Sequence, residues 1–256
     1  MSTRSHPIAV FFALACAITW ALATPLVLAW VRQVEPPGYA IPLAGLSALG
    51  PTLAAALLAR REGRLRELFG RWRTHPGWIL FALLTPMALH MVANLLELAL
   101  GGHPAQWVYL PVTAEHVAAL VMFSVGEEIG WRGYAHPRVT ARLGMVRGSV
   151  VLGAVWGLWH LLYCVTPSGS FDATAFGLGV LELSLYAIVF AWIFERTSRS
   201  LAVAIALHAG GHLDNLHRAP ESDLRVRVLY LAVVAIAAVL AARSLRRMPA
   251  SDRVAS

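Results

Sequence analysis

The chain has 256 residues, of which 58% are hydrophobic and only 14% are charged, with a mean hydropathy of +0.62. Soluble domains carry about 25% charged residues, so this composition excludes an ordinary soluble domain and indicates a multi-pass membrane protein. The formal net charge is +7 and all 21 basic residues are arginines. No nucleic-acid-binding motif accompanies them, so we assign the excess to loops that face anionic lipid.

The apolar runs, taken in chain order, predict eight transmembrane helices. The first, residues 8–31, is uncharged, too long for the roughly 7–15-residue apolar core of a signal peptide, and long enough to span a bilayer. The others are expected at about 38–59, 78–100, 114–135, 149–165, 174–195, 201–217 and 226–242. Charged residues shorten the fourth, seventh and eighth runs, so seven helices with a re-entrant element form the main alternative.

The arginines also predict the orientation. With the N-terminus inside, basic residues gather in the inner loops, and only four fall outside: Arg32, Arg218, Arg225 and Arg227. Because basic residues concentrate in cytoplasmic loops, eight helices with both termini in the cytoplasm fit best. No polar stretch is long enough for a separate core. We therefore expect one all-α integral-membrane domain over residues 1–256, in a bacterial-type cytoplasmic membrane.

Two adjacent carboxylates and an arginine interrupt the fourth run, in the segment GEEIGWRGY at residues 126–134. Ionisable side chains are costly in hydrocarbon and usually functional there. Glu128 and Arg132 are four residues apart and share a helix face, which predicts an ion pair. Glu127 lies about 100° away around the helix and is expected to lack this partner. The spacing therefore predicts that Glu127 does chemistry and that Glu128 is structural.

Three histidines on later runs are predicted to lie at depths similar to that of Glu127. His160 ends the motif WGLWH, and His208 and His212 delimit the motif HAGGH. At about 1.5 Å per residue, Glu127 and His208 lie roughly 10–15 Å from the cytoplasmic boundary, and His160 lies roughly 18 Å from it. His208, His212 and Asn215 follow one helical stripe at i, i+4 and i+7.

Two chemistries fit one glutamate and three histidines. Glutamate can act as a general base on water with one histidine assisting, while other His or Asn side chains stabilise an oxyanion. Alternatively, the same side chains form an adequate ligand set for a zinc-like metal that activates water. A purely structural interpretation competes with both chemistries. In it, the glutamates and the arginine form an ion-pair cluster at the membrane interface, and the histidines are packed core residues. The shared depth of three motifs favours a functional site.

The motifs EEIGWR at 127–132, WGLWH at 156–160 and HAGGH at 208–212 resemble, in order and spacing, the signature of a known family. EExxxR, [FW]xxxH and Hxxx[ND] are typical of the CPBP family, intramembrane proteases that include CAAX proteases and bacteriocin-processing (Abi) proteins. The resemblance covers about residues 114–217. It implies an endopeptidase that acts on membrane-associated peptides or proteins, at a site open to the cytoplasmic half of the membrane.

The resemblance also implies roles by position. Glu127 would be the general base or a metal ligand, and His160 would help to activate water. His208 would orient the substrate or stabilise the oxyanion. Glu128 and Arg132 would organise the site.

The cofactor and one site residue are left open by the resemblance. Family members have been described both as metalloproteases and as metal-independent glutamate-dependent proteases, and the candidate zinc ligands here are Glu127, His160, His208 and His212. His212 stands where the family usually has Asn or Asp. Histidine can donate to an oxyanion and is also a better zinc ligand than Asn. Asn215, one turn further on, is an alternative for this role.

Two other functions remain as alternatives. A transporter or channel would use the buried Glu and His side chains as an ion path, but the sequence shows no repeated or helix-broken halves. A noncatalytic membrane scaffold or immunity protein could keep the same fold. The sequence does not choose among prenylated-cysteine processing, peptide maturation, toxin immunity and membrane-protein turnover, and it predicts no oligomeric state.

Overall fold

The computed structural model describes residues 7–69, 71–104, 107, 113–213 and 224–248. These residues form helices and contain no strand beyond one isolated bridge between Val165 and Phe171. The helices form two compact units, each built from two separate stretches of the chain. Unit 1 comprises Met1–Gly70 and Val125–Ala187, and unit 2 comprises Arg71–Ser124 and Ile188–Ser256.

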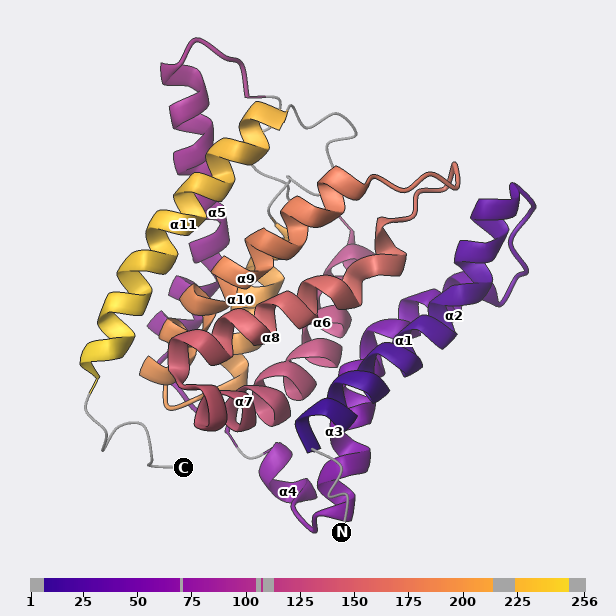
Figure 1. Ribbon diagram of the computed structural model, residues 1–256, viewed down its shortest axis with the longest axis horizontal. Coiled ribbons are helices and arrows are strands. Elements are labelled where there is room, and N and C mark those ends of the chain that lie inside the picture. Colours follow the sequence, from indigo (N-terminus) through magenta and orange to yellow (C-terminus); the bar gives the residue numbers. More distant parts are fainter. Residues whose placement is uncertain (1–6, 70, 105–106, 108–112, 214–223, 249–256) are drawn as a thin grey trace. The chain divides into compact units, whose positions relative to one another are not determined.

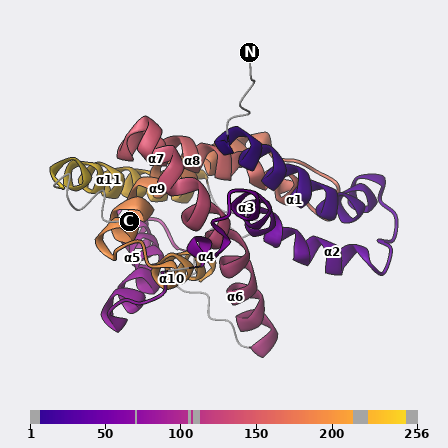
Figure 2. The same ribbon diagram turned by 90° about the horizontal axis from the view of Figure 1, so that it is seen from below.

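The N-terminal part of unit 1 is a hairpin of apolar helices (Figures 1 and 2). Its elements are α1 (Pro7–Arg32), α2 (Ala40–Leu46), the 3₁₀ turn η1 (Ser47–Leu49), α3 (Gly50–Arg61) and the short α4 (Leu65–Leu68). The predicted second span is thus interrupted at η1. Pro51 has no N–H to donate to the carbonyl of Ser47, and the hydroxyl of Thr19 donates to that carbonyl instead, at 2.8 Å. The interruption therefore follows from the proline.

The second part of unit 1 carries most of the signature motifs. Its elements are the end of α6 (Ala114–Glu128), the π-helix η2 (Ile129–Ala135), α7 (His136–Leu143), α8 (Met145–Trp159), the 3₁₀ helix η3 (His160–Cys164) and the first part of α9 (Ala173–Arg196). Helix α8 packs closely on α9 through two glycines. A Cβ at Gly153 would overlap the Leu183 carbonyl, and one at Gly157 would lie 2.7 Å from Val180 Cα. Small residues permit this approach between membrane helices.

Unit 2 is organised around α5 (Pro76–Ala99), which contacts both α10 (Leu201–His212) and α11 (Leu224–Arg247). Glu97, 3% exposed, forms an ion pair with Arg225 of α11, with 3.1 Å between Oε2 and Nε. At the start of α10, the backbone N–H of Leu201 donates to the carbonyl of Arg71 at 2.7 Å. These contacts fix the two helices against α5 and its preceding segment.

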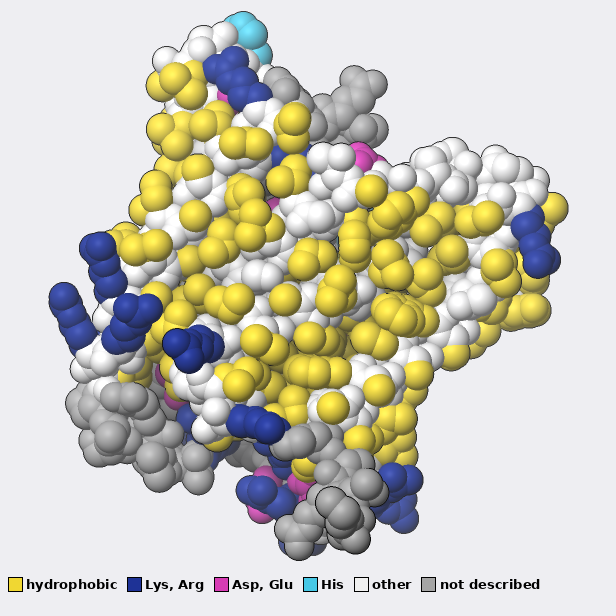
Figure 3. Space-filling view, viewed as in Figure 1, with side chains coloured by type: hydrophobic (Ala, Val, Ile, Leu, Met, Phe, Trp, Pro, Cys, Tyr) yellow, Lys and Arg dark blue, Asp and Glu magenta, His cyan; other side chains and the backbone are white. Residues whose placement is uncertain are grey.

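Six helical segments within the described residues are long and apolar enough to cross a membrane: α1, α2 to α3, α5, α8 to η3, α9 and α11. Helix α10 is apolar but shorter, and residues 214–217 of its predicted span lie outside the described residues. Hydrophobic side chains cover much of the surface seen in Figure 3, with arginines near helix ends. The chain is an all-α, multi-pass integral membrane protein, as predicted. The count of eight and the cytoplasmic termini stay predictions.

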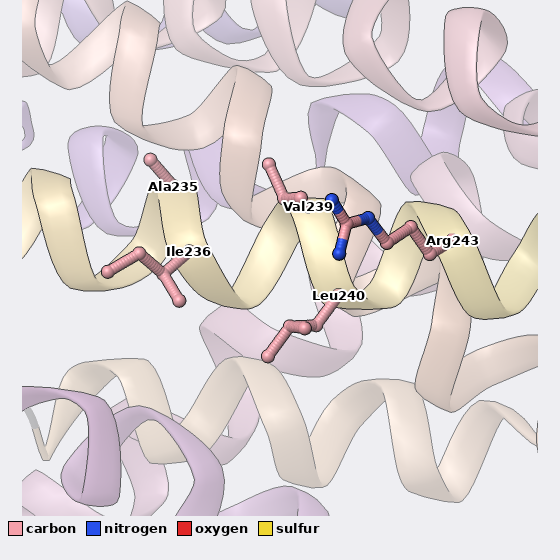
Figure 4. A pocket seen from close by; sticks show the side chains of 5 residues that line it. All are labelled: Ala235, Ile236, Val239, Leu240 and Arg243. Carbon is pink, nitrogen blue, oxygen red and sulfur yellow. The ribbon is translucent and has the colours of Figure 1, made fainter.

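One face of α11 forms a shallow apolar groove, lined by Ala235, Ile236, Val239, Leu240 and Arg243 (Figure 4). Ile236 and Leu240 are 63% and 59% exposed. An exposed apolar face that ends at an arginine is typical of a helix that faces lipid. No candidate site residue lines this groove, so it is not the candidate active site.

Candidate active site

The two adjacent glutamates are the last residues of α6, and the π-helix η2 follows them directly. Both are buried, with Glu127 4% and Glu128 0% exposed. Single-turn π-helices are rare and often occur at functional sites. Gly130 lets this segment approach α3 closely, because a Cβ there would overlap the backbone carbonyl of Pro51. The motif is therefore seated against α3 inside unit 1.

The predicted ion pair between Glu128 and Arg132 is confirmed. Arg132 Nη1 lies 3.5 Å from Glu128 Oε2, and the two side chains are at most 1% exposed. The guanidinium also lies over the ring of Trp156, 4.8 Å from its centroid, an arrangement that favours a cation. The pair is thus part of the interior of unit 1, and its role in organising a site stays a prediction.

Glu127 has a hydrogen-bond partner that the sequence analysis did not foresee. Trp156 Nε1 of α8 donates a hydrogen bond to Glu127 Oε2, at 2.9 Å. The residue spacing within α6 could not predict this contact. The donor, Trp156, belongs to another helix and lies 29 positions after Glu127 in the sequence. The sequence analysis assigned a role only to the histidine of the motif WGLWH, so it missed Trp156 as a site residue. Its position four residues before His160 was the available signal.

His160 is held by the way α8 ends. The helix stops at Trp159, and the backbone N–H of His160 donates to the carbonyl of Gly157, which tightens the chain into η3. This leaves the carbonyl of Trp156 available for the His160 side chain, and Nδ1 lies 2.8 Å from it. A carbonyl can only accept, so Nδ1 donates, and in the neutral ring Nε2 keeps its lone pair. The end of α8 therefore fixes the neutral His160 ring in the tautomer that carries its proton on Nδ1.

Aromatic side chains border the His160 ring. Trp159 meets it edge-on at 4.8 Å between centroids, and Tyr163 lies 5.9 Å away. Both are anchored to the N-terminal hairpin: Trp159 Nε1 donates to Thr19 Oγ1 at 2.9 Å, and the Tyr163 hydroxyl lies 2.6 Å from Ser47 Oγ. The hairpin, where the sequence showed nothing diagnostic, thus supports the surroundings of His160.

A second set of contacts anchors Tyr134 and Arg138, which lie at and just beyond the end of the segment GEEIGWRGY. The Tyr134 hydroxyl donates to Glu62 Oε1 at 2.6 Å, and Arg138 Nη2 donates to Glu62 Oε2 at 2.5 Å. The Arg138 guanidinium also lies over the Tyr134 ring, 3.7 Å from its centroid. These contacts tie η2 and α7 to the end of α3. The sequence analysis did not single out Glu62, so its role was missed.

In unit 2, His208 and His212 share one face of α10, as their spacing predicts. Their rings stack with 5.0 Å between centroids and an interplanar angle of 24°. His208 is 7% exposed, and the ring of Phe123 lies 6.1 Å from that of His212. Asn215, the predicted continuation of this stripe, lies outside the described residues.

Gly210 is expected to be essential for the position of α10, whereas the adjacent Gly211 is not. A Cβ at Gly210 would overlap the Leu83 carbonyl of α5, but one at Gly211 would meet nothing within 4 Å. Gly210→Ala should therefore cost about 1–3 kcal/mol through overpacking. Gly211→Ala should be neutral or slightly stabilising, because alanine favours helix. Thermal unfolding of both variants in detergent is the measurement, and equal midpoints would contradict the close packing.

The candidate residues are divided between the two units. Unit 1 brings Glu127 and His160 to Trp156, and unit 2 stacks His208 on His212. That these pairs share one site stays a prediction. Within either unit, the described residues contain no group of three or more His, Cys, Asp or Glu side chains placed to hold a metal. Two of the four candidate zinc ligands belong to unit 1 and two to unit 2. Zinc binding therefore also stays a prediction.

Comparisons with known proteins agree with the motifs. A family model described as type II CAAX prenyl endopeptidase Rce1-like matches residues 106–213, which include all three motifs but not Asn215. The protein named CAAX prenyl protease 2 from Methanococcus maripaludis is 27% identical over 169 residues. That alignment covers 60% of this chain and 62% of the relative. The motifs and the two matches together show that the chain is similar to the CPBP family of CAAX-protease-like membrane proteins.

Proposed function

We propose that the chain is an intramembrane endopeptidase that hydrolyses membrane-associated peptides or proteins at a site in the cytoplasmic half of the bilayer. One observation carries this proposal. The carboxylate of Glu127 and the ring of His160 are both hydrogen-bonded to the same residue, Trp156, in the interior of unit 1. A buried carboxylate and a tautomer-fixed histidine are the groups that activation of water requires. The named relative is also a protease.

In the proposed reaction, Glu127 is the general base. Its Oε2 accepts the indole hydrogen bond, so Oε1 accepts a proton from water while His160 Nε2 orients that water. The new hydroxide forms a bond with the carbonyl carbon of the peptide. His208 and His212 donate hydrogen bonds to the oxyanion that results. Glu127 then returns the proton to the amide nitrogen as the C–N bond breaks.

A metal-dependent version uses the same residues. Glu127 and His160, with His208 and His212, would be the ligands. His160 fits such a role, because metal-binding histidines usually donate their second ring nitrogen to a carbonyl, as Nδ1 does here. When bound, zinc would supply a more acidic water and polarise the peptide carbonyl. Metal analysis before and after chelation distinguishes the versions: stoichiometric zinc that is lost together with activity establishes the metalloprotease.

Replacing His160 by alanine is expected to reduce cleavage at least 100-fold, because a positioned acid–base group contributes about 10²–10⁴-fold. The assay uses purified protein in lipid vesicles with a library of membrane-anchored peptides, with and without a prenylated cysteine. His103→Ala is the matched control, because His103 is exposed and lies outside the three motifs. Wild-type protein that cleaves nothing across this library would contradict the proposed function.

A further inference from the structure

We infer that Trp156 is a positioning residue that fixes Glu127 and His160 relative to one another; this inference rests on the proposed function. Three different parts of Trp156 make three different contacts. The indole N–H donates to the Glu127 carboxylate, the backbone carbonyl accepts from His160 Nδ1, and the ring lies under the Arg132 guanidinium. One residue therefore connects the proposed base, its partner histidine and the organising ion pair.

Trp156 is itself held firmly in unit 1. Its side chain is 4% exposed, and the glycines on either side of it in α8, Gly153 and Gly157, pack against the α9 backbone. A Cβ at either glycine would force the two helices apart. The donor is therefore fixed before any substrate binds, which is the condition for preorganised catalysis.

The N–H group distinguishes tryptophan from other aromatic residues at this position. Phenylalanine would keep a ring beside Arg132 but would leave one oxygen of the buried Glu127 carboxylate without this donor. A carboxylate with one fewer hydrogen bond is freer to rotate, and a misplacement of about 1 Å can cost about 100-fold in rate. The backbone carbonyl remains in every variant, so His160 keeps its hydrogen bond. The substitution therefore tests the Glu127 contact selectively.

The first test compares Trp156→Phe with Trp192→Phe in the vesicle assay. Trp192 also loses an indole hydrogen bond, of 3.0 Å to Ser244 Oγ, but it contacts no candidate site residue in the described structure. We expect Trp156→Phe to lower kcat about tenfold, the equivalent of one hydrogen bond of about 1.4 kcal/mol, and to leave KM within twofold. Trp192→Phe should keep the wild-type kcat. An unchanged kcat for Trp156→Phe, or an effect confined to KM, would overturn the inference.

The second test does not depend on turnover. Thermal unfolding is measured for wild type, Trp156→Phe, Glu127→Ala and the double variant. If the indole acts on Glu127, Trp156→Phe should lower the midpoint by about 2–4 °C in wild type and by much less in Glu127→Ala. Equal shifts in both backgrounds would overturn the inference. Absence of cleavage by wild type refutes the proposed function alone, and the unfolding cycle then still decides whether Trp156 holds Glu127.

Discussion

Glu127→Gln is expected to reduce peptide cleavage by about 10²–10⁴-fold without unfolding the protein. Glutamine has the same size, and its carbonyl oxygen can accept the hydrogen bond that Trp156 Nε1 donates to Glu127. It cannot accept a proton from water, so the proposed base is removed while the local packing is kept. The measurement is kcat for the most rapidly cleaved membrane-anchored peptide, together with the thermal unfolding midpoint.

Glu67→Gln is the matched control for this substitution. Glu67 lies in the same unit and pairs with Arg64, but the two side chains are 62% and 56% exposed. Exposed ion pairs contribute little to stability, and Glu67 contacts no candidate site residue in the described structure. This variant should cleave at the wild-type rate. A Glu127→Gln protein that cleaves within tenfold of wild type would refute the assignment of Glu127 as the base.

Arg132→Ala is expected to give the largest loss of stability, about 3–5 kcal/mol. Removal of one partner of a buried ion pair leaves the other charge in a medium that solvates it poorly. Here the remaining group is Glu128, which is 0% exposed and loses its guanidinium partner. The cation–π contact with Trp156 is lost as well. Chemical unfolding in detergent micelles is the measurement.

Two further variants make the Arg132 prediction specific. Arg64→Ala breaks the exposed pair with Glu67 and should unfold like wild type. The double variant Glu128→Leu with Arg132→Met replaces the buried charges by apolar side chains, and it should recover more than half of the lost stability. A destabilisation by Arg132→Ala no larger than that by Arg64→Ala would show that the buried pair contributes nothing.

The sequence predicted those parts of the molecule that depend on one helix at a time. Long apolar runs require helices in a bilayer, and the Glu128–Arg132 pair follows from a spacing of four residues. The stacking of His208 on His212 follows from the same rule. Each of these features is local, so the periodicity of the α-helix is sufficient to predict it.

Contacts between helices were not predictable in this way. The hydrogen bond from Trp156 to Glu127 and the one from Trp159 to Thr19 join residues 29 and 140 positions apart. Their formation depends on which faces of the helices pack together, and a single sequence does not contain that information. The change to a π-helix after Glu128 was also missed, because the run at 114–135 was expected to form one uninterrupted helix. The interruption before Pro51 had a visible signal, the proline itself.

The π-helix η2 also restricts how the chain can change in length. Deletion of one residue between Ile129 and Ala135 would rotate and shift the residues that follow relative to α6. Tyr134 and Arg138 would then leave Glu62, which now anchors them to α3. The seven residues of η2 thus act as a spacer of fixed length between α6 and α7.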